Sequence, residues 1–254
     1  MDHLSSYGSN EAGLSAGAID CFRRLDKGEW RSPIFAELLA LEARDRDGCL
    51  TLLEIGCGLG FDGDHALQKK VAALAGRVIG VEPDPDVVPQ PVFTELHRCL
   101  IEQAPIEPES VDLAFSVMVM EHVPDPAAFL GAVHRVLRKG GVYWGFTVNR
   151  RHWFSIASTV ASRLHLKTAY LQWLNGANDK EDYLDYPTFY RLNSAAAFRC
   201  GDPKFARVYT RSYGAVDAAA GYVAGPLKGV VKAFETARVR LGGGRIGFLV
   251  RLEK

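Results

Sequence analysis

Three alternating glycines directly follow an apolar stretch, and they constrain the fold of this chain more than any other feature. The stretch at residues 52–55 is apolar apart from Glu54, and Gly56, Gly58 and Gly60 come after it. Glycine has no Cβ atom, so such a turn adopts φ values closed to other residues and leaves backbone N–H groups open to a ligand. The pattern predicts a ligand-binding loop at the end of a strand.

The spacing of the glycines discriminates between nucleotide ligands. A dinucleotide-binding turn reads G-x-G-x-x-G, whereas here the third glycine comes one residue early and Phe61 stands in its place. About twenty residues after the last glycine, a second apolar run at 78–81 ends in Glu82, the position of an acid that binds ribose hydroxyls. The pattern favours a nucleoside ligand, and an NAD-linked oxidoreductase remains an alternative.

The composition restricts the classes of partner. The 254 residues suffice for one domain with an additional small insertion. The 30 basic side chains balance the 30 acidic ones, so the protein has no net charge that would attract nucleic acid or an anionic membrane. A small-molecule substrate is expected instead. The five cysteines are scattered without a C-x-x-C pair, which favours reduced thiols in a cytoplasmic protein over a metal site or disulfides. The N-terminus shows no signal-peptide pattern, and no apolar run is long enough to span a bilayer.

Strand and helix patterns alternate along the chain, which predicts an α/β fold with a parallel sheet covered on both faces. Helical patterns at 15–46, with Ser32 and Pro33 as a helix start, precede the first strand. Strands are expected at 50–55, 77–82, 96–101, 111–117 and 142–148, with helices at 62–75, at 85–95 and from the cap Asp125-Pro126 to Gly140-Gly141.

The pattern changes after the fifth strand. Residues 151–176 predict two helices, an insertion between strands five and six that covers a pocket. A strand at 204–213, a helix near 226–240 and a strand at 245–252 are expected to complete the sheet. A single domain is therefore predicted, with an N-terminal helical cap at 1–48, a cofactor-binding core at 49–148, a helical insertion or lid at 149–200, and C-terminal strands and helix at 201–254.

With these elements placed, residues 30–254 resemble the class I S-adenosylmethionine-dependent methyltransferases, of the bacterial type that acts on small molecules. Residues 54–60 resemble the first motif of the family, 81–83 the second, 105–112 the run into strand four and 135–141 the helix end before strand five. The resemblance implies a Rossmann-like, seven-stranded sheet whose last strand is antiparallel, with S-adenosylmethionine over the carboxyl ends of strands one, two and four. It assigns cofactor binding to Glu54, Gly56, Cys57, Gly58, Gly60, Glu82, Pro83, Glu102, Val117 and Met118.

Two of these assignments carry alternatives. Glu54 either faces the methionine end of the cofactor or only braces the glycine loop by accepting N–H bonds. Near strand three, the family commonly has an aspartate that accepts the adenine amino group, but this chain has Leu100 there. Glu102, two residues later, or a backbone carbonyl is expected to take that role.

If the methyl acceptor is a hydroxyl group, a general base has to remove its proton, whereas an amine or a carboxylate depends less on such a base. His122, which follows strand four, and His152, at the mouth of the insertion, are the candidates, because histidine titrates near neutral pH. Each has a structural alternative, as a loop residue beside the cofactor and as part of a solvated helix start. Tyr186, Tyr190 and Arg191 are candidates for substrate contact, with simple packing as the alternative.

The sequence thus predicts methyl transfer to an oxygen, and less readily to a nitrogen, of a small molecule such as a sugar or secondary metabolite. A methyltransferase-like protein that binds the cofactor without turnover is a further alternative. The product S-adenosylhomocysteine is implied, and the protein is expected to be a monomer or a homodimer.

Overall fold

The computed structural model describes residues 14–44, 46, 49–163, 186–198, 205–215 and 227–254. Its centre is a seven-stranded sheet in the order β3-β2-β1-β4-β5-β7-β6. β7 runs antiparallel to its neighbours β5 and β6, and the pairs among β1 to β5 are parallel. The strands are β1 (Thr51–Ile55), β2 (Arg77–Val81), β3 (Glu95–His97), β4 (Val111–Val117), β5 (Leu137–Val148), β6 (Arg207–Tyr213) and β7 (Gly247–Glu253).

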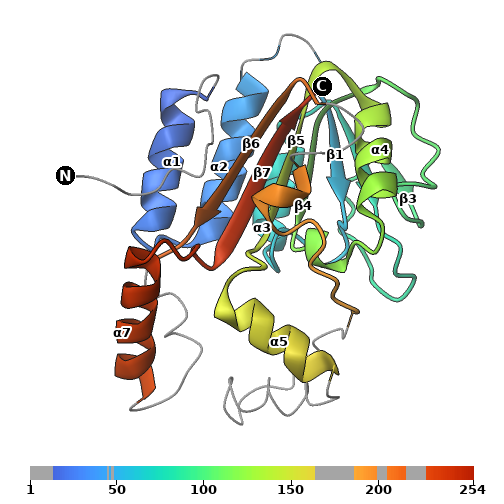
Figure 1. The fold of residues 1–254 in the computed structure, drawn as a ribbon. Helices are drawn as coiled ribbons and strands as arrows, with labels where there is room; N and C mark the ends of the chain where they lie inside the picture. The colour runs from blue at the N-terminus through green and yellow to red at the C-terminus, as the bar shows by residue number, and fades with distance from the viewer. Residues whose placement is uncertain (1–13, 45, 47–48, 164–185, 199–204, 216–226) are drawn as a thin grey trace.

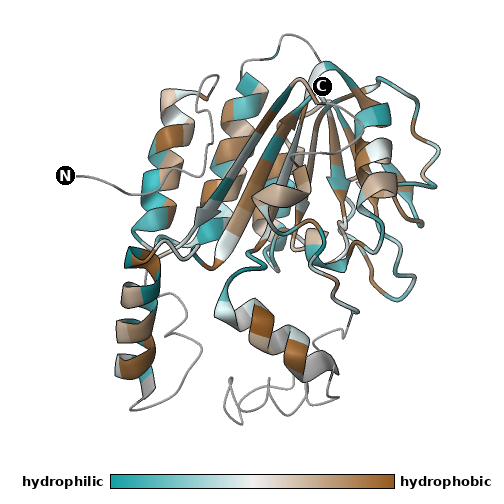
Figure 2. Ribbon diagram, viewed as in Figure 1, coloured by the Kyte–Doolittle hydropathy of each residue, from teal (hydrophilic) through white to brown (hydrophobic). Residues whose placement is uncertain are grey.

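Helices cover both faces of this sheet, as Figure 1 shows. On one face, α1 (Ala16–Asp26), α2 (Arg31–Arg44) and α3 (His65–Ala72) share one hydrophobic cluster with the strands. On the other face, α4 (Pro126–Val136) shares a second cluster. All five residues of β1 are buried, as expected for a central parallel strand with both faces covered. In Figure 2 brown stretches, which mark hydrophobic residues, alternate with white and teal ones along the strands of the sheet.

Four further helices complete the described part of the chain. They are the short helices η1 (Met120–His122) and η2 (Ala195–Phe198), and the helices α5 (Trp153–Arg163) and α7 (Leu227–Arg240). In Figure 1, α5 and α7 lie at the lower end of the sheet, beyond the carboxyl ends of the parallel strands. The described part of α5 falls between β5 and β6, as predicted for the insertion, and residues 164–176 of the expected second helix lie outside the described residues. None of the helices in the described ranges has the length and hydropathy of a membrane-spanning segment.

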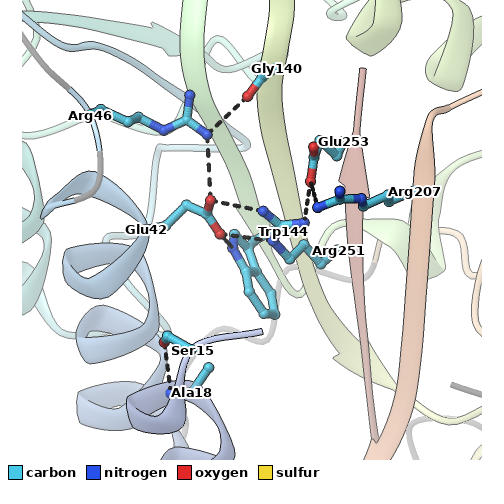
Figure 3. A network of polar contacts seen from close by, with 9 residues as sticks. All are labelled: Ser15, Ala18, Glu42, Arg46, Gly140, Trp144, Arg207, Arg251 and Glu253. Carbon is cyan, nitrogen blue, oxygen red and sulfur yellow. Dashed lines mark hydrogen bonds and ion pairs between the residues drawn. The ribbon is translucent and has the colours of Figure 1, made fainter. Parts of the chain in front are cut away.

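A partly buried charge network attaches α2 to the sheet (Figure 3). The carboxylate of Glu42 accepts hydrogen bonds from Arg251 Nε and NH2 at 2.8 and 2.9 Å, and from Trp144 Nε1 at 3.1 Å. Burial alone would raise the pKa of Glu42, but the bonds to Arg251 outweigh it and lower the pKa. The first helical layer is therefore fixed to β5 and β7 by an ionised carboxylate.

Three local predictions were wrong. No helix forms at 85–95, because prolines at 85, 89 and 91 remove backbone donors and disfavour helical φ/ψ in the residues before them. Ser32 does not cap α2, which begins one residue earlier; its hydroxyl donates instead to Asp62 Oδ2 at 2.7 Å. Strand three spans three residues rather than six.

The end of α4 also differs from the prediction. The helix starts at the expected cap, where Asp125 Oδ1 accepts hydrogen bonds from two backbone N–H groups. It ends at Val136 rather than at Gly140-Gly141. Both glycines lie within β5, at a shift in its register with β4.

Candidate active site

The carboxyl ends of β1, β2 and β4 lie side by side and carry the predicted cofactor motifs. The parallel register pairs Glu54 with Gly80 and Ile55 with Val81 on β2, and Glu54 with Phe115 on β4. Loops that leave neighbouring parallel strands at the same edge form the usual ligand crevice of an α/β sheet. The first and second motifs are therefore brought together as predicted.

The glycine loop packs too tightly for side chains. Gly56 has φ +73° and donates from its N–H to Val81 O at 2.8 Å, and a Cβ atom there would lie 2.4 Å from Val119 Cγ2. A Cβ atom on Gly60, at φ +80°, would lie 2.6 Å from His65 Nδ1. Both positions require glycine, because the left-handed conformation and the close neighbours each exclude larger residues.

Glu82 connects the ends of the first two strands. Its Oε2 accepts a hydrogen bond from Gly58 N at 2.9 Å, and its Oε1 accepts one from Asp84 N at 3.0 Å. The residue is buried, with 8% of its surface exposed. An ionised carboxylate has about four acceptor sites, so two bonds to the protein leave each oxygen able to accept a ligand hydroxyl.

Glu54 is buried at the end of β1 and is linked to the glycine loop through Gln68. The Gln68 amide donates to Glu54 Oε1 at 3.1 Å and to Cys57 O at 2.8 Å. Burial raises the pKa of Glu54 to about 8, the negative charge of Glu82 adds to this, and the bond from Gln68 opposes it. Glu54 is thus linked to the loop through the Gln68 amide rather than by accepting loop N–H bonds in the described residues, and at neutral pH it carries a proton.

The other predicted cofactor residues surround this centre. Cys57 is buried, and burial raises the pKa of its thiol. Met118, directly after β4, has φ +56° and donates from its N–H to Phe146 O at 2.8 Å. Glu102 Oε2 is buried and has no hydrogen-bond partner in the described residues. Pro83 is exposed, and Val117 ends β4 partly buried.

His122 lies in η1, beside the carboxyl end of β4. Its Nδ1 is 2.9 Å from Pro187 O. A carbonyl oxygen only accepts hydrogen bonds, so Nδ1 carries the proton in this contact and the neutral ring has its lone pair on Nε2. This arrangement combines the predicted loop contact with a nitrogen that is able to accept a proton.

His152 was expected at the mouth of the insertion, but the structure buries it completely. Its Nε2 lies 3.1 Å from Glu235 Oε2 on α7, and Arg238 NH2 donates to the same carboxylate oxygen at 2.9 Å. Burial lowers the pKa of His152, against the opposing effect of Glu235. The contact joins the start of α5 to α7, and it does not bring His152 together with His122.

Two of the three predicted substrate residues use their polar groups in contacts with the protein, and the third is buried. The Tyr186 hydroxyl donates to Asp84 Oδ2, and its ring meets His122 edge-on at 5.7 Å. Tyr190 is buried, with φ +51°. Arg191 donates to Pro124 O, so its guanidinium is used to hold a neighbouring loop.

Two polar groups of this region were not predicted. Asp62, just after the glycines, accepts two bonds from Arg31 at 2.7 and 2.8 Å and so ties the loop to α2. Glu121 is buried, and its Oε2 accepts from Thr147 Oγ1 at 2.5 Å. Burial raises the pKa of Glu121. In the sequence, Asp62 is marked by its position just after the glycine turn, and Glu121 by its position next to the candidate base His122.

Residues 53–144 match the family model described as a methyltransferase domain. This match identifies residues 53–144 as similar to a methyltransferase domain, and the sheet order agrees with the fold expected for the class I S-adenosylmethionine-dependent methyltransferases. The matched residues run from β1 to the middle of β5 and so include the strands that carry the predicted cofactor motifs.

Individual relatives agree with this match. The chain is 35% identical over 125 residues to a probable S-adenosylmethionine-dependent methyltransferase of Mycolicibacterium smegmatis, and the match covers 47% of this chain and 45% of that protein. It is 30% identical over 135 residues to a ubiquinone biosynthesis O-methyltransferase of Bradyrhizobium, where the match covers 49% and 48%. The chain therefore spans less than half the length of these curated relatives.

A solved structure of a geranyl diphosphate methyltransferase in complex with S-adenosylmethionine shares the fold. Its TM-score is 0.51 at 16% identity, over 97% of this chain and 95% of that one. At this identity the similarity concerns the fold alone, and it extends over nearly the whole of both chains.

The described residues fit the cofactor of this class. Glu82 is fixed by two backbone N–H groups and has acceptor capacity left for ribose hydroxyls. Glu102 provides a buried oxygen without a partner in the described part of the chain, which suits an amino group such as that of adenine. Glu54 provides a buried carboxyl on the same side as Glu82.

Proposed function

We propose that this protein transfers the methyl group of S-adenosylmethionine to an oxygen of a small molecule. The observation that carries the proposal is the position of Glu82, whose carboxylate joins the glycine loop to the end of β2. An acid held there by the loop is suited to a ribose, and Phe61 in place of the dinucleotide glycine disfavours NAD.

Oxygen is favoured over nitrogen by the relatives and by His122. Several of the similar proteins are named as O-methyltransferases of ubiquinone biosynthesis. His122 is a suitable base, because its Nδ1–H donates to Pro187 O and Nε2 is left to take a hydroxyl proton. The balanced net charge favours a small acceptor over nucleic acid, and we propose a cytoplasmic monomer or homodimer.

When bound, S-adenosylmethionine supplies an electrophilic methyl group on a cationic sulfur. In this proposal His122 Nε2 would take the proton that the acceptor hydroxyl gives up as its oxygen receives the methyl group. The protein has to hold the two reactants in line, and such positioning contributes roughly 7–11 kcal/mol in well-oriented systems. A covalent intermediate is unnecessary.

Calorimetry with S-adenosylhomocysteine and with NAD tests the cofactor. We expect micromolar binding of S-adenosylhomocysteine and none of NAD; binding of NAD alone would refute the proposal. Mass spectrometry of a small-metabolite extract incubated with S-adenosylmethionine then tests turnover, since a product heavier by one methylene unit is expected.

Once a methyl acceptor has been identified, the variant His122→Ala tests whether His122 acts as the general base. Loss of a positioned base typically costs about 100-fold or more in rate, so kcat should fall by that factor while S-adenosylhomocysteine affinity stays unchanged. His134→Ala, on α4 and away from the site, is the matched control. A His122→Ala enzyme with the wild-type rate would end the role of His122.

A further inference from the structure

Residues 186–193, here called the strap, cross the carboxyl ends of three strands. Tyr186 contacts Asp84, which follows β2; the middle of the strap bonds to η1, which follows β4; and Asn193 bonds to the end of β5. In Figure 1 the strap is the orange trace that leads to η2. It therefore lies over the crevice to which we assign the cofactor, and the inference below rests on that proposed function.

The middle of the strap is held by the backbone of η1. Glu121 O accepts hydrogen bonds from Phe189 N at 2.7 Å and from Tyr190 N at 3.1 Å. Tyr190 adopts the left-handed conformation, which is unfavourable for a non-glycine residue and persists only where its surroundings fix it. This part of the strap is firmly attached.

The β5 end of the strap is buried and bonded on several sides. Asn193 is completely buried, and its Nδ2 donates to Thr147 Oγ1 at 2.7 Å and to Val148 O at 2.9 Å. Thr147 in turn donates to the buried Glu121, and Asn193 O accepts from Arg150 N at 3.0 Å. Detaching this end would break several linked buried hydrogen bonds at once, which is costly because such bonds strengthen one another in a low-dielectric environment.

Within the described part of the strap, Tyr186 is the residue that reaches the β2 side, through the hydrogen bond from its hydroxyl to Asp84 Oδ2. The backbone N–H of Asp84 also donates to Glu82 Oε1. Asp84 therefore contacts both Tyr186 and Glu82, the proposed ribose-binding acid. Both Tyr186 and Asp84 are partly exposed, in contrast to the buried Asn193.

We propose that Tyr186 is a gate over the cofactor site, which the hydroxyl contact with Asp84 holds closed. The firmly bonded β4 and β5 ends of the strap fix its position, and the weakly held β2 end opens to admit and release the cofactor. Local opening is least costly where buried contacts are fewest, and ligand exchange in many enzymes is limited by such steps.

Tyr186→Phe tests the gate, because it removes the hydroxyl and retains the ring. Stopped-flow mixing with S-adenosylhomocysteine, followed by tryptophan fluorescence, gives the association and dissociation rates. A hydrogen bond to a carboxylate is lost, so we expect both rates to rise, by roughly tenfold each. The dissociation constant should change much less than either rate, since opening is facilitated with and without ligand.

Tyr209→Phe provides the matched control, because it makes the same change on β6, at the opposite edge of the sheet from β2. Its rates should equal those of the wild type. Asp84→Asn/Tyr186→Phe should exchange ligand no faster than Tyr186→Phe alone, because the contact is already lost.

Two results would overturn the gate. One is unchanged rates in Tyr186→Phe; the other is a faster dissociation with an unchanged association rate, which would make Tyr186 a direct ligand contact. Absence of S-adenosylhomocysteine binding by the wild type would instead refute the proposed function, so the two failures are distinguishable.

Discussion

The buried carboxyl of Glu54 makes the stability of this protein dependent on pH. Glu54 is 4% exposed, and its Oε1 accepts one hydrogen bond from Gln68. Burial is the main cause that raises its pKa, and the negative charge of Glu82 raises it further. The carboxyl therefore remains protonated in the folded state up to a pKa of about 8, against 4.5 for its ordinary value.

The size of the effect follows from this difference in pKa. At 1.36 kcal/mol per pKa unit, the full shift corresponds to roughly 5 kcal/mol. The folded state binds the extra proton between pH 4.5 and 8, so stability falls as the pH rises through this window. The contribution is complete below about pH 4.5 and is lost as the pH passes 8. Between pH 5 and pH 8 the loss is roughly 3.5 kcal/mol.

Glu54→Gln removes the titration and keeps an oxygen for the Gln68 amide. Urea unfolding of both proteins at several pH values from 5 to 8 gives their free energies of unfolding. We expect the variant to gain roughly 3.5 kcal/mol relative to the wild type over this range, because the introduced amide does not titrate. Other titrating groups cancel in the comparison. Parallel pH profiles would refute the assignment of a raised pKa to Glu54.

Two further predictions concern packing and charge. Gly58→Ala places a Cβ atom 2.3 Å from Val87 Cγ1 and 2.7 Å from Glu82 Oε2, so it should destabilise the protein by about 1–3 kcal/mol in urea unfolding and weaken S-adenosylhomocysteine binding. Gly131→Ala, which meets no atom within 4 Å, should do neither, and equal effects would contradict the packing argument. Glu42→Ala leaves Arg251 without this carboxylate and should cost about 3–5 kcal/mol, whereas a loss below about 1 kcal/mol would show that the network in Figure 3 contributes little.

The sheet could be predicted because its signals are local. Apolar runs and caps such as Asp125-Pro126 depend on neighbouring residues, and β4 has the predicted bounds of 111–117. The prediction of secondary structure failed where two local sequence signals favoured different conformations. At 85–95 an apolar helical pattern coincided with prolines, and the loss of backbone donors decided the outcome.

The position of Glu82 beside the glycine loop could be predicted from the sequence, whereas the contacts of Tyr186 and His152 could not. The offset of Glu82 from the glycines is set by one βαβ unit, so a sequence pattern records it. The contact between Tyr186 and Asp84 joins residues 102 positions apart, and the burial of His152 depends on Glu235 on a distant helix. No local pattern specifies which distant side chains meet.

A crystal structure of the protein with S-adenosylhomocysteine tests the central claim most directly. The account predicts ribose hydroxyls within hydrogen-bond distance of the Glu82 carboxylate, while Glu82 Oε2 still accepts from Gly58 N. A nucleoside bound elsewhere, with Glu82 engaged only by the protein backbone, would contradict it.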